Sequence, residues 1–297
     1  MTYRGRFAPS PTGPLHFGSL VAAVGSYLEA HAHGGEWLVR IDDLDPPRVV
    51  PGAADDILRT LEGFGFEWDG DVVYQGRRND AYHAALHRLR ATGLVYPCAC
   101  SRKEVMTEGI IGIEGFVYPG TCRYGLPAGR PAHALRLDAR GEPVAFDDAI
   151  QGRVEQDIGR AVGDFVLYRT EGVFSYHLAC AVDDAEQGIT HVVRGADLLA
   201  STARQILIQR LLGLPLPHYA HLPVALNAAG EKLSKQNLAP AVEKRDAAKT
   251  LVAVLAFLGQ QPPAALAATD VTAVWAWAHG HWSIAQVPRE RSIEIAA

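Results

Sequence analysis

The sequence predicts an α/β fold in which helices cover a parallel sheet. Short apolar runs alternate with helical patterns through the first hundred residues, and the same alternation returns at residues 174–213. Between these two regions the chain is rich in Gly, Pro and Cys and offers only short strand-like pieces. We therefore expect a main α/β domain at residues 1–93 and 171–229, an insertion at residues 94–170, and a small helical part at residues 230–297.

The first elements follow from the residue types near the N-terminus. Residues 3–8 are predicted to form a strand. A turn at residues 9–14 must follow, because its prolines cannot continue a strand or enter a helix interior. A helix then begins near His16, since apolar residues recur along one face from Leu20 to Leu28. Later strands are expected at residues 36–41 and 189–193, and later helices at residues 53–64, 80–92, 198–212, 247–258 and 264–279.

Composition excludes several classes of protein. The chain has 297 residues, of which 48% are hydrophobic and 21% charged, so it is not disordered. No apolar run reaches the ~18 residues of a membrane span, and the N-terminus lacks the apolar core of a secretory signal. We therefore expect a cytoplasmic protein. The net charge of -5 excludes a strongly basic nucleic-acid binder, so any contact with phosphate backbones has to be local.

Two short elements are candidates for phosphate binding. The predicted helix opens at His16-Phe17-Gly18-Ser19, where backbone amides and the positive helix end favour anions. Gly18 would let a ligand approach the backbone, and His16 could donate a hydrogen bond to a phosphate oxygen. The second element is a polar loop, residues 230–235, with lysines at 232 and 235. Taken alone, the first element is more often ordinary packing and the second a solvated face.

The order of these two elements resembles the class I aminoacyl-tRNA synthetases, whose signature motifs lie at the first helix and after the last sheet strand. The resemblance implies a Rossmann-type catalytic domain and an ATP site. In it, His16, Lys232 and Lys235, with Mg²⁺, would stabilise the charge that develops when a carboxylate attacks the α-phosphorus. No side-chain nucleophile is needed, because positioning and electrostatics can supply the rate. The implied ATP contacts are Pro9, His16, Gly18, Ser19, Lys232, Ser234 and Lys235.

Within this class the chain is similar to the glutamyl and glutaminyl branch. The similar segments are Arg6 to Gly13, Arg40 to Arg48, Tyr176 to Ala179 and Val193 to Leu199. The resemblance, which covers roughly residues 3–240, implies a glutamate substrate. The implied glutamate site consists of Arg6, Ser10, Asp42, Tyr176 and Arg194.

The chemistry of that predicted site matches a dicarboxylic amino acid. Arg6 and Arg194 would bind carboxylates through forked donors, and Asp42 would bind the ammonium. Ser10 and Tyr176 would supply neutral hydrogen bonds. The family usually has Glu in place of Asp42, so a water, a backbone shift or Asp43 has to compensate for the shorter side chain. The alternative is that these charges form surface ion pairs.

Cys98, Cys100 and Cys122 fall within 25 residues and form a candidate metal site. In a reducing compartment such a cluster suggests metal more than disulfide. Resemblance to short glutamyl-type enzymes implies a structural zinc with Tyr118 as fourth ligand, whose phenol would have to lose its proton. A water or another side chain in fourth place, or three thiols without metal, are the alternatives. Cys180 is expected to be a buried apolar residue.

Only 62 residues follow Lys235, fewer than the ~100 of a typical domain, so we expect no anticodon-binding domain. Such a short chain resembles the truncated branch members that activate glutamate without tRNA and attach it to queuosine in the anticodon of tRNA(Asp). The expected partners are ATP, L-glutamate and queuosine-bearing tRNA(Asp), and the expected state is a monomer. Three alternatives remain: a synthetase that charges a tRNA 3′ end, a non-catalytic paralogue that binds glutamate or tRNA, and a small-molecule nucleotidyltransferase.

Overall fold

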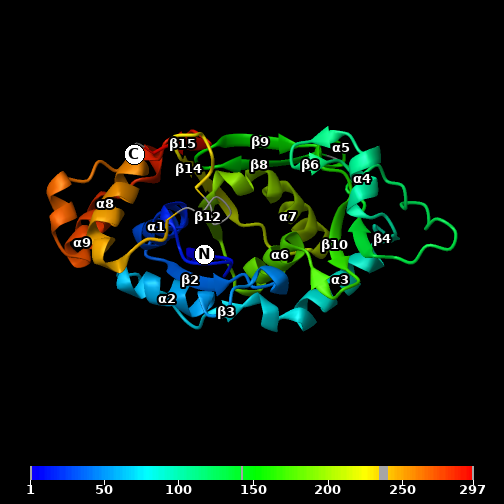
Figure 1. The fold of residues 1–297 in the computed structure, drawn as a ribbon, viewed down its shortest axis with the longest axis horizontal. Coiled ribbons are helices and arrows are strands. Elements are labelled where there is room, and N and C mark those ends of the chain that lie inside the picture. Colours follow the sequence, from blue (N-terminus) through cyan, green and yellow to red (C-terminus); the bar gives the residue numbers. More distant parts are fainter. Residues whose placement is uncertain (1, 142, 234–239, 296–297) are drawn as a thin grey trace.

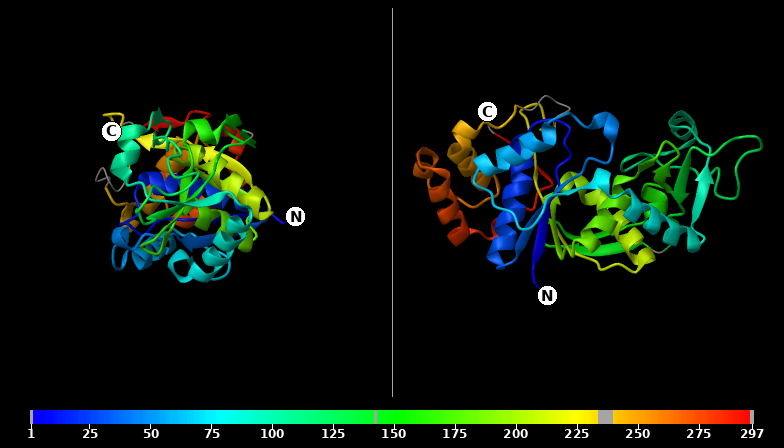
Figure 2. Two further views of the ribbon diagram at one scale, coloured as in Figure 1. Left: turned by 90° about the vertical axis from the view of Figure 1, so that its right-hand side faces the viewer. Right: turned by 90° about the horizontal axis from the view of Figure 1, so that it is seen from below.

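The computed structural model describes residues 2–141, 143–233 and 240–295, and its elements form an elongated molecule (Figure 1). Ser234 and Lys235, both predicted to contact ATP, lie outside the described residues. Helices α8 and α9 lie at one end of the molecule and the cysteine-bearing segment lies at the other (Figure 2). The sheets that carry the candidate site lie between these two ends.

The N-terminal half alternates strands and helices as predicted. Its order is β1 (Arg4–Phe7), α1 (Phe17–Ala32), β2 (Glu36–Ile41), α2 (Ala53–Gly63), β3 (Val73–Tyr74) and α3 (Asn79–Ala91). The three strands are parallel in the order β1-β2-β3, which confirms the predicted parallel sheet. Leu20, Val24 and Leu28 of α1 are buried in the core beneath this sheet, as the apolar face of the helix required.

The second half adds β12 (His191–Gly195), β13 (His218–Leu222), α6 (Tyr176–Glu186) and α7 (Leu199–Leu212). Strands β12 and β13 are parallel and lie beside the first ladder, where the Thr190 amide donates to the Arg4 carbonyl at 3.0 Å. The two halves thus adjoin at β1 and β12 without one continuous ladder. A cavity opens between the carboxyl ends of these two strands, the place where open α/β sheets bind ligands.

Most of the segment between the two halves forms a separate antiparallel sheet in the order β11-β10-β7-β4. One part departs from this arrangement: β8 pairs in parallel with β13, through Tyr219 and Asp148, and β9 extends it. Residues 144–156 therefore belong to the same sheet as β12 and β13, although they lie within the expected insertion. The elements of this segment are β4 (Val95–Cys98), α4 (Arg102–Glu108), β5 (Ile111–Gly112), β6 (Gly115–Phe116), β7 (Ala134–Leu137), β8 (Val144–Asp148), β9 (Gly152–Gln156), α5 (Ile158–Ala161), β10 (Phe165–Arg169) and β11 (Val173–Phe174).

The C-terminal part is mainly helical and packs against α1 (Figure 1). It contains α8 (Ala247–Phe257) and α9 (Val271–His281), close to the predicted helices. A short strand, β15 (Ser292–Glu294), pairs in parallel with β14 (Val224–Leu226) and was not predicted. None of the helices in the described part of the chain combines the length and apolar character that a membrane span requires. Short 3-10 helices lie at Pro46–Arg48, Gln75–Arg77, Ala196–Leu198, Lys244–Asp246, Ala264–Ala268 and Ile284–Gln286.

Candidate functional site

The cavity at the carboxyl ends of β1 and β12 gathers residues from both halves of the chain and has a volume of about 220 Å³. The N-terminus of α1 forms one wall, and the segment after β14 forms another. Residues predicted for ATP and residues predicted for glutamate line the same cavity. Those that line it are Arg6, His16, Gly18, Ser19, Tyr176, Arg194 and Lys232.

His16 is the N-cap residue of α1. Its Nδ1 accepts a hydrogen bond from the Ser19 amide at 3.3 Å, so in this geometry the ring proton resides on Nε2. A Cβ atom at Gly18 would lie 3.3 Å from the His16 ring and from the Leu233 carbonyl oxygen. Glycine therefore allows the start of α1 and the segment after β14 to lie close together. The helix start therefore presents backbone amides and an imidazole donor to one cavity.

Lys232 reaches this cavity from the segment that follows β14. Its Nζ lies 2.5 Å from Oδ2 of Asp197, an acidic residue that the sequence reasoning did not select. The segment itself is fixed by the Leu233 amide, which donates to the Ala225 carbonyl at 2.9 Å. Lys232 thus lies within reach of an anion in the cavity, with Asp197 as its present partner.

Arg6 lies at the end of β1 and is only 3% exposed. Its Nε is 3.2 Å from Oδ1 of Asp184, and Arg40 Nη1 is 2.7 Å from the same oxygen. Burial alone would raise the pKa of Asp184, but Arg6 and Arg40 lower it to about 2. The carboxylate of Asp184 therefore keeps both arginines in place, and Arg40 has a second carboxylate partner in Asp42.

Asp42 is buried, and Arg40 Nε donates to its Oδ1 at 2.8 Å. Burial raises the pKa of Asp42, although Arg40 works in the opposite direction. Its Oδ2 lies 3.7 Å from the Cys180 sulfur, and Cys180 is buried as predicted. Asp42 and Arg6 do form ion pairs, as in the alternative to a glutamate site, but these pairs are buried inside the protein and do not lie on its surface.

A second cavity of about 240 Å³ lies on the other side of Tyr176. It is lined by Ser10 and Asp42, so the predicted glutamate residues divide between two neighbouring cavities that share Tyr176. Burial raises the pKa of Tyr176 above its ordinary value and keeps the phenol protonated. Pro9 lies next to this group, since its carbonyl accepts from the Asp42 amide at 3.0 Å.

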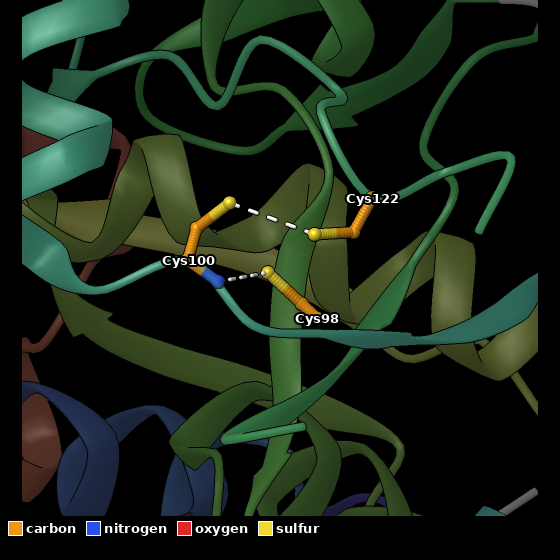
Figure 3. A group of neighbouring side chains, drawn as sticks. All are labelled: Cys98, Cys100 and Cys122. Atoms are coloured by element: carbon orange, nitrogen blue, oxygen red, sulfur yellow. Dashed lines mark hydrogen bonds between the residues drawn. The ribbon is translucent and has the colours of Figure 1, made fainter. Parts of the chain in front are cut away.

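The three cysteines of the insertion converge, and Figure 3 shows their sulfur atoms pointing toward one another. All three sulfurs lie within 4.8 Å of each other. The Tyr118 hydroxyl lies 3.4 Å from Cys98 Sγ and 3.6 Å from Cys100 Sγ, and it accepts from the Cys122 amide at 2.9 Å. Three soft thiols around one point form a donor set suited to zinc.

The surroundings of the cysteine cluster favour negative charge at one sulfur. Burial opposes ionisation of Cys98, but hydrogen bonds from Tyr118, the Cys100 amide and Arg136 lower its pKa overall. Burial raises the pKa of Cys100 to about 11 and also raises that of Tyr118. Hydrogen bonding therefore favours the thiolate at Cys98, whereas burial favours the protonated forms of Cys100 and Tyr118, and a bound cation would shift both of these donors toward ionisation.

Comparison with known proteins gives a consistent result. Residues 2–110 and 127–265 match the family model described as tRNA synthetases class I (E and Q), catalytic domain. A glutamyl-Q tRNA(Asp) synthetase of Dechloromonas aromatica (strain RCB) is 62% identical over 297 residues, which cover 99% of both chains. The chain belongs to the glutamyl-Q tRNA(Asp) synthetase family. The relative from Aromatoleum aromaticum (strain DSM 19018 / LMG 30748 / EbN1) is 58% identical and covers 98% of this chain and 92% of that protein.

Solved structures place the glutamyl-Q family fold among the glutamyl enzymes. The glutamate-tRNA synthetase of Elizabethkingia anophelis superimposes with a TM-score of 0.82 at 25% identity, covering all of this chain and 68% of that one. A glutamate tRNA ligase from Elizabethkingia meningosepticum CCUG26117, in complex with its amino acid, superimposes with a TM-score of 0.81 at 25% identity, covering all of this chain and 68% of that one. The class I fold and a ligase-type enzyme are thus confirmed.

Several buried polar residues of this glutamyl-Q family member were not predicted from the sequence. Arg40, Asp183 and Asp184 join β2 to α6, and Asp148 and His221 join β8 to β13. Charged residues inside apolar patterns, as in Asp183-Asp184 of α6, were the available signal because such groups are seldom buried without a partner. Their partners lie more than 70 residues away, and no local pattern identifies them.

Proposed function

We propose that the enzyme forms glutamyl-adenylate from ATP and glutamate without tRNA and transfers the glutamyl group to queuosine in the anticodon of tRNA(Asp). The observation that carries this proposal is the shared cavity, in which Arg6 and Arg194 lie with His16 and Lys232. Two guanidinium groups suit a substrate with two carboxylates, and the other two groups suit phosphates. The names of the relatives support the choice of glutamate and of tRNA(Asp).

The first step is attack of a glutamate carboxylate oxygen on the α-phosphorus of ATP, with loss of pyrophosphate. Negative charge grows on the phosphate oxygens, and donors fixed in advance stabilise it. His16 Nε2 and the first amides of α1 would act at the helix start, and Lys232 would act from the opposite wall. We assign the same role to Lys235 and the neighbouring contact to Ser234, with Mg²⁺ bound to the ATP phosphates.

Glutamate would bind between the two halves of the chain. Arg6 and Arg194 would bind its carboxylates, and the Tyr176 phenol would donate a hydrogen bond at the junction of the two cavities. Asp42 would receive the ammonium on Oδ2, since Arg40 already occupies Oδ1. Ser10, in the second cavity with Asp42, would complete this polar end.

Transfer requires an acceptor beside the adenylate. A hydroxyl of the acceptor would attack the carbonyl carbon of the mixed anhydride, and AMP would leave with the bonding electrons. The second cavity shares Tyr176 with the first and has Arg48, Arg102 and Arg169 in its wall, so it suits an RNA substrate. Arg102 and Arg169 supply local positive charge that the overall charge of -5 does not, whereas Arg48 is paired with Asp45 at 2.8 Å.

A zinc ion would hold the insertion together. Cys98, Cys100 and Cys122 would be its thiolate ligands, with the Tyr118 phenolate in fourth place. Four protein ligands leave no open position, so the metal would be structural and take no part in the reaction. The insertion would then be a rigid wall beside the second cavity.

Charging of a tRNA 3′ end is the second candidate, because the fold matches two glutamate-tRNA ligases over its whole length. Glutamate-dependent exchange of pyrophosphate into ATP, assayed without tRNA, tests the first step. We expect exchange with glutamate and background with glutamine. Transfer of labelled glutamate to queuosine-modified tRNA(Asp), compared with unmodified tRNA(Glu), separates the two candidates. Label on tRNA(Glu) alone would contradict our proposal.

A further inference from the structure

The guanidinium of Arg194 is held along one edge and unsatisfied along another. Arg194 is 4% exposed and lines the first cavity. Its Nε donates to His221 Nε2 at 3.1 Å, and its Nη2 donates to Thr202 Oγ1 at 2.8 Å. Nη1 is buried without a hydrogen-bond partner among the residues that the structure describes. Because an unsatisfied buried donor costs free energy, Nη1 indicates where a ligand must supply an acceptor.

His221 connects Arg194 to a buried carboxylate. It is fully buried in β13, and its Nδ1 lies 2.6 Å from Asp148 Oδ2. Nε2 can accept from Arg194 only when it carries no proton, so the ring proton has to be on Nδ1 and donates to Asp148. Burial is the main reason why the pKa of His221 is lowered to about 4, and the charge of Arg194 adds to this effect. The hydrogen bond to Asp148 acts in the opposite direction. The ring is therefore neutral, with a defined tautomer.

Asp148 is fixed in turn by the backbone. Its Oδ1 accepts from the amides of Ile150, Gln151 and His221 at 3.0, 2.9 and 3.1 Å. It is the last residue of β8, the strand that pairs in parallel with β13 at Tyr219. Because β8 pairs with β13, the carboxylate of Asp148 lies beside the imidazole of His221.

We propose that Asp148 and His221 are positioning residues that orient Arg194 so that Nη1 receives a carboxylate oxygen of the amino-acid substrate. This inference rests on the proposed function, which supplies the carboxylate. Asp148 holds the tautomer in which His221 Nε2 accepts, and the hydrogen bond that Arg194 Nε donates to this nitrogen fixes the plane of the guanidinium. Neither residue touches the substrate. They act only through the orientation of the Arg194 guanidinium.

Three substitutions separate this role from simple packing. Asp148→Asn keeps an oxygen for the three backbone amides but turns an NH₂ donor toward His221 Nδ1. The ring proton then moves to Nε2, which can no longer accept the hydrogen bond from Arg194. His221→Asn places its amide at the level of Nδ1, within reach of Asp148 but short of Arg194. His221→Gln reaches the level of Nε2 and offers an oxygen to Arg194. Asp147→Asn, at an exposed neighbouring position of β8, is the matched control.

The assay is glutamate-dependent pyrophosphate exchange in the full chain, with unfolding temperatures measured in parallel. Asp148→Asn and His221→Asn should raise the KM for glutamate about tenfold or more, as expected for a lost hydrogen bond to a charged group. The KM for ATP should change less than about twofold. His221→Gln should retain most of the glutamate affinity, and Asp147→Asn should match the unmodified chain. An unchanged glutamate KM in folded Asp148→Asn and His221→Asn, or equal losses for both substrates, would overturn the inference.

A second measurement does not depend on whether Asp148→Asn and His221→Asn fold. In the unmodified protein labelled with ¹⁵N-histidine, the ring signal that His221→Gln removes should show a protonated Nδ1 and an unprotonated Nε2. A protonated Nε2 would overturn the inference. Absence of glutamate-dependent exchange in the unmodified enzyme would instead refute the proposed function, so the two failures are distinguishable.

Discussion

His16 combines two tasks at the start of α1, since it caps the helix and lines the first cavity. Nδ1 is engaged by the Ser19 amide, so Nε2 is the nitrogen that can donate to a phosphate oxygen. A substitution by alanine would therefore remove the cap and the proposed charge-stabilising donor together. A substitution that keeps the helix cap but not the ring donor can separate the effect on stability from the effect on the reaction.

We predict that His16→Ala and His16→Asn each lower the adenylation rate by about 10²-fold or more, because a lost transition-state donor costs a few kcal/mol. Asparagine is a good N-cap, so His16→Asn should melt no lower than the unmodified chain, whereas His16→Ala should lose about 1 kcal/mol of stability. Pyrophosphate exchange and thermal unfolding measure the two effects. A normal exchange rate in either variant would exclude His16 from the chemistry.

The lowered pKa of His221 predicts that the stability of the folded protein depends on pH. Its pKa is about 4 in the folded protein against an ordinary value of 6.5. Between these values the unfolded chain binds the proton more readily, so folding stability falls as the pH drops from 6.5 toward 4. From pH 7 to 5 the unmodified chain should lose on the order of 2 kcal/mol more than His221→Gln, measured by urea unfolding. Equal losses in the two proteins would contradict the assignment.

At the scale of elements, α6 is held to α3 and to the segment after β3 by one buried carboxylate. Asp183 accepts from Gln75 Nε2 at 2.8 Å, Arg78 Nε at 2.6 Å and the Tyr82 hydroxyl at 2.7 Å. Tyr176 begins α6, at the junction of the two cavities, so the position of this helix affects both. Asp183 is therefore a structural support of the site without lining it.

We predict that Asp183→Ala destabilises the protein by about 3–5 kcal/mol, because it leaves the buried donors of Gln75 and Tyr82 and the Nε of Arg78 without their acceptor. Glu186→Gln is the control, since Glu186 lies on the same helix but its side chain is half exposed. It should cost less than about 0.5 kcal/mol. Urea unfolding of both variants decides this point, and a loss below about 1 kcal/mol for Asp183→Ala would count against the support role.

The segment around α4 gives a prediction about metal. Cys98→Ser should release zinc and loosen residues 95–137, because a structural site contributes folding free energy. Cys180→Ser should keep the metal, since Cys180 lies beside Asp42, away from the cluster. Metal analysis of the purified proteins measures the difference. Native protein without zinc would end this part of the proposal.

At the scale of the molecule, the residue pattern predicted β1, β2 and β12 and the helices α1, α2, α3, α7, α8 and α9, with β2 at its observed bounds, but not the separate strands of residues 95–174. Several residues named from the family motifs line the first cavity, whereas Ser10 and Asp42 line the second. The return of β8 to β13 was not predictable, because residues 144–148 form a strand that could pair with any neighbour. Arg40 illustrates the same limit. It lies in an apolar strand, and its partner Asp184 is 144 residues away. Long-range pairs of this kind depend on tertiary packing, which local patterns do not encode.

The proposed activity requires that an adenylating cavity deliver glutamate to an RNA acceptor in the neighbouring cavity. The most direct measurement is mass analysis of queuosine-modified tRNA(Asp) after incubation with the enzyme, ATP and glutamate, followed by nuclease digestion. We predict that the anticodon fragment containing queuosine gains the mass of one glutamyl group and that the 3′-terminal fragment does not. An unmodified anticodon fragment, or a gain confined to the 3′ end, would contradict the account.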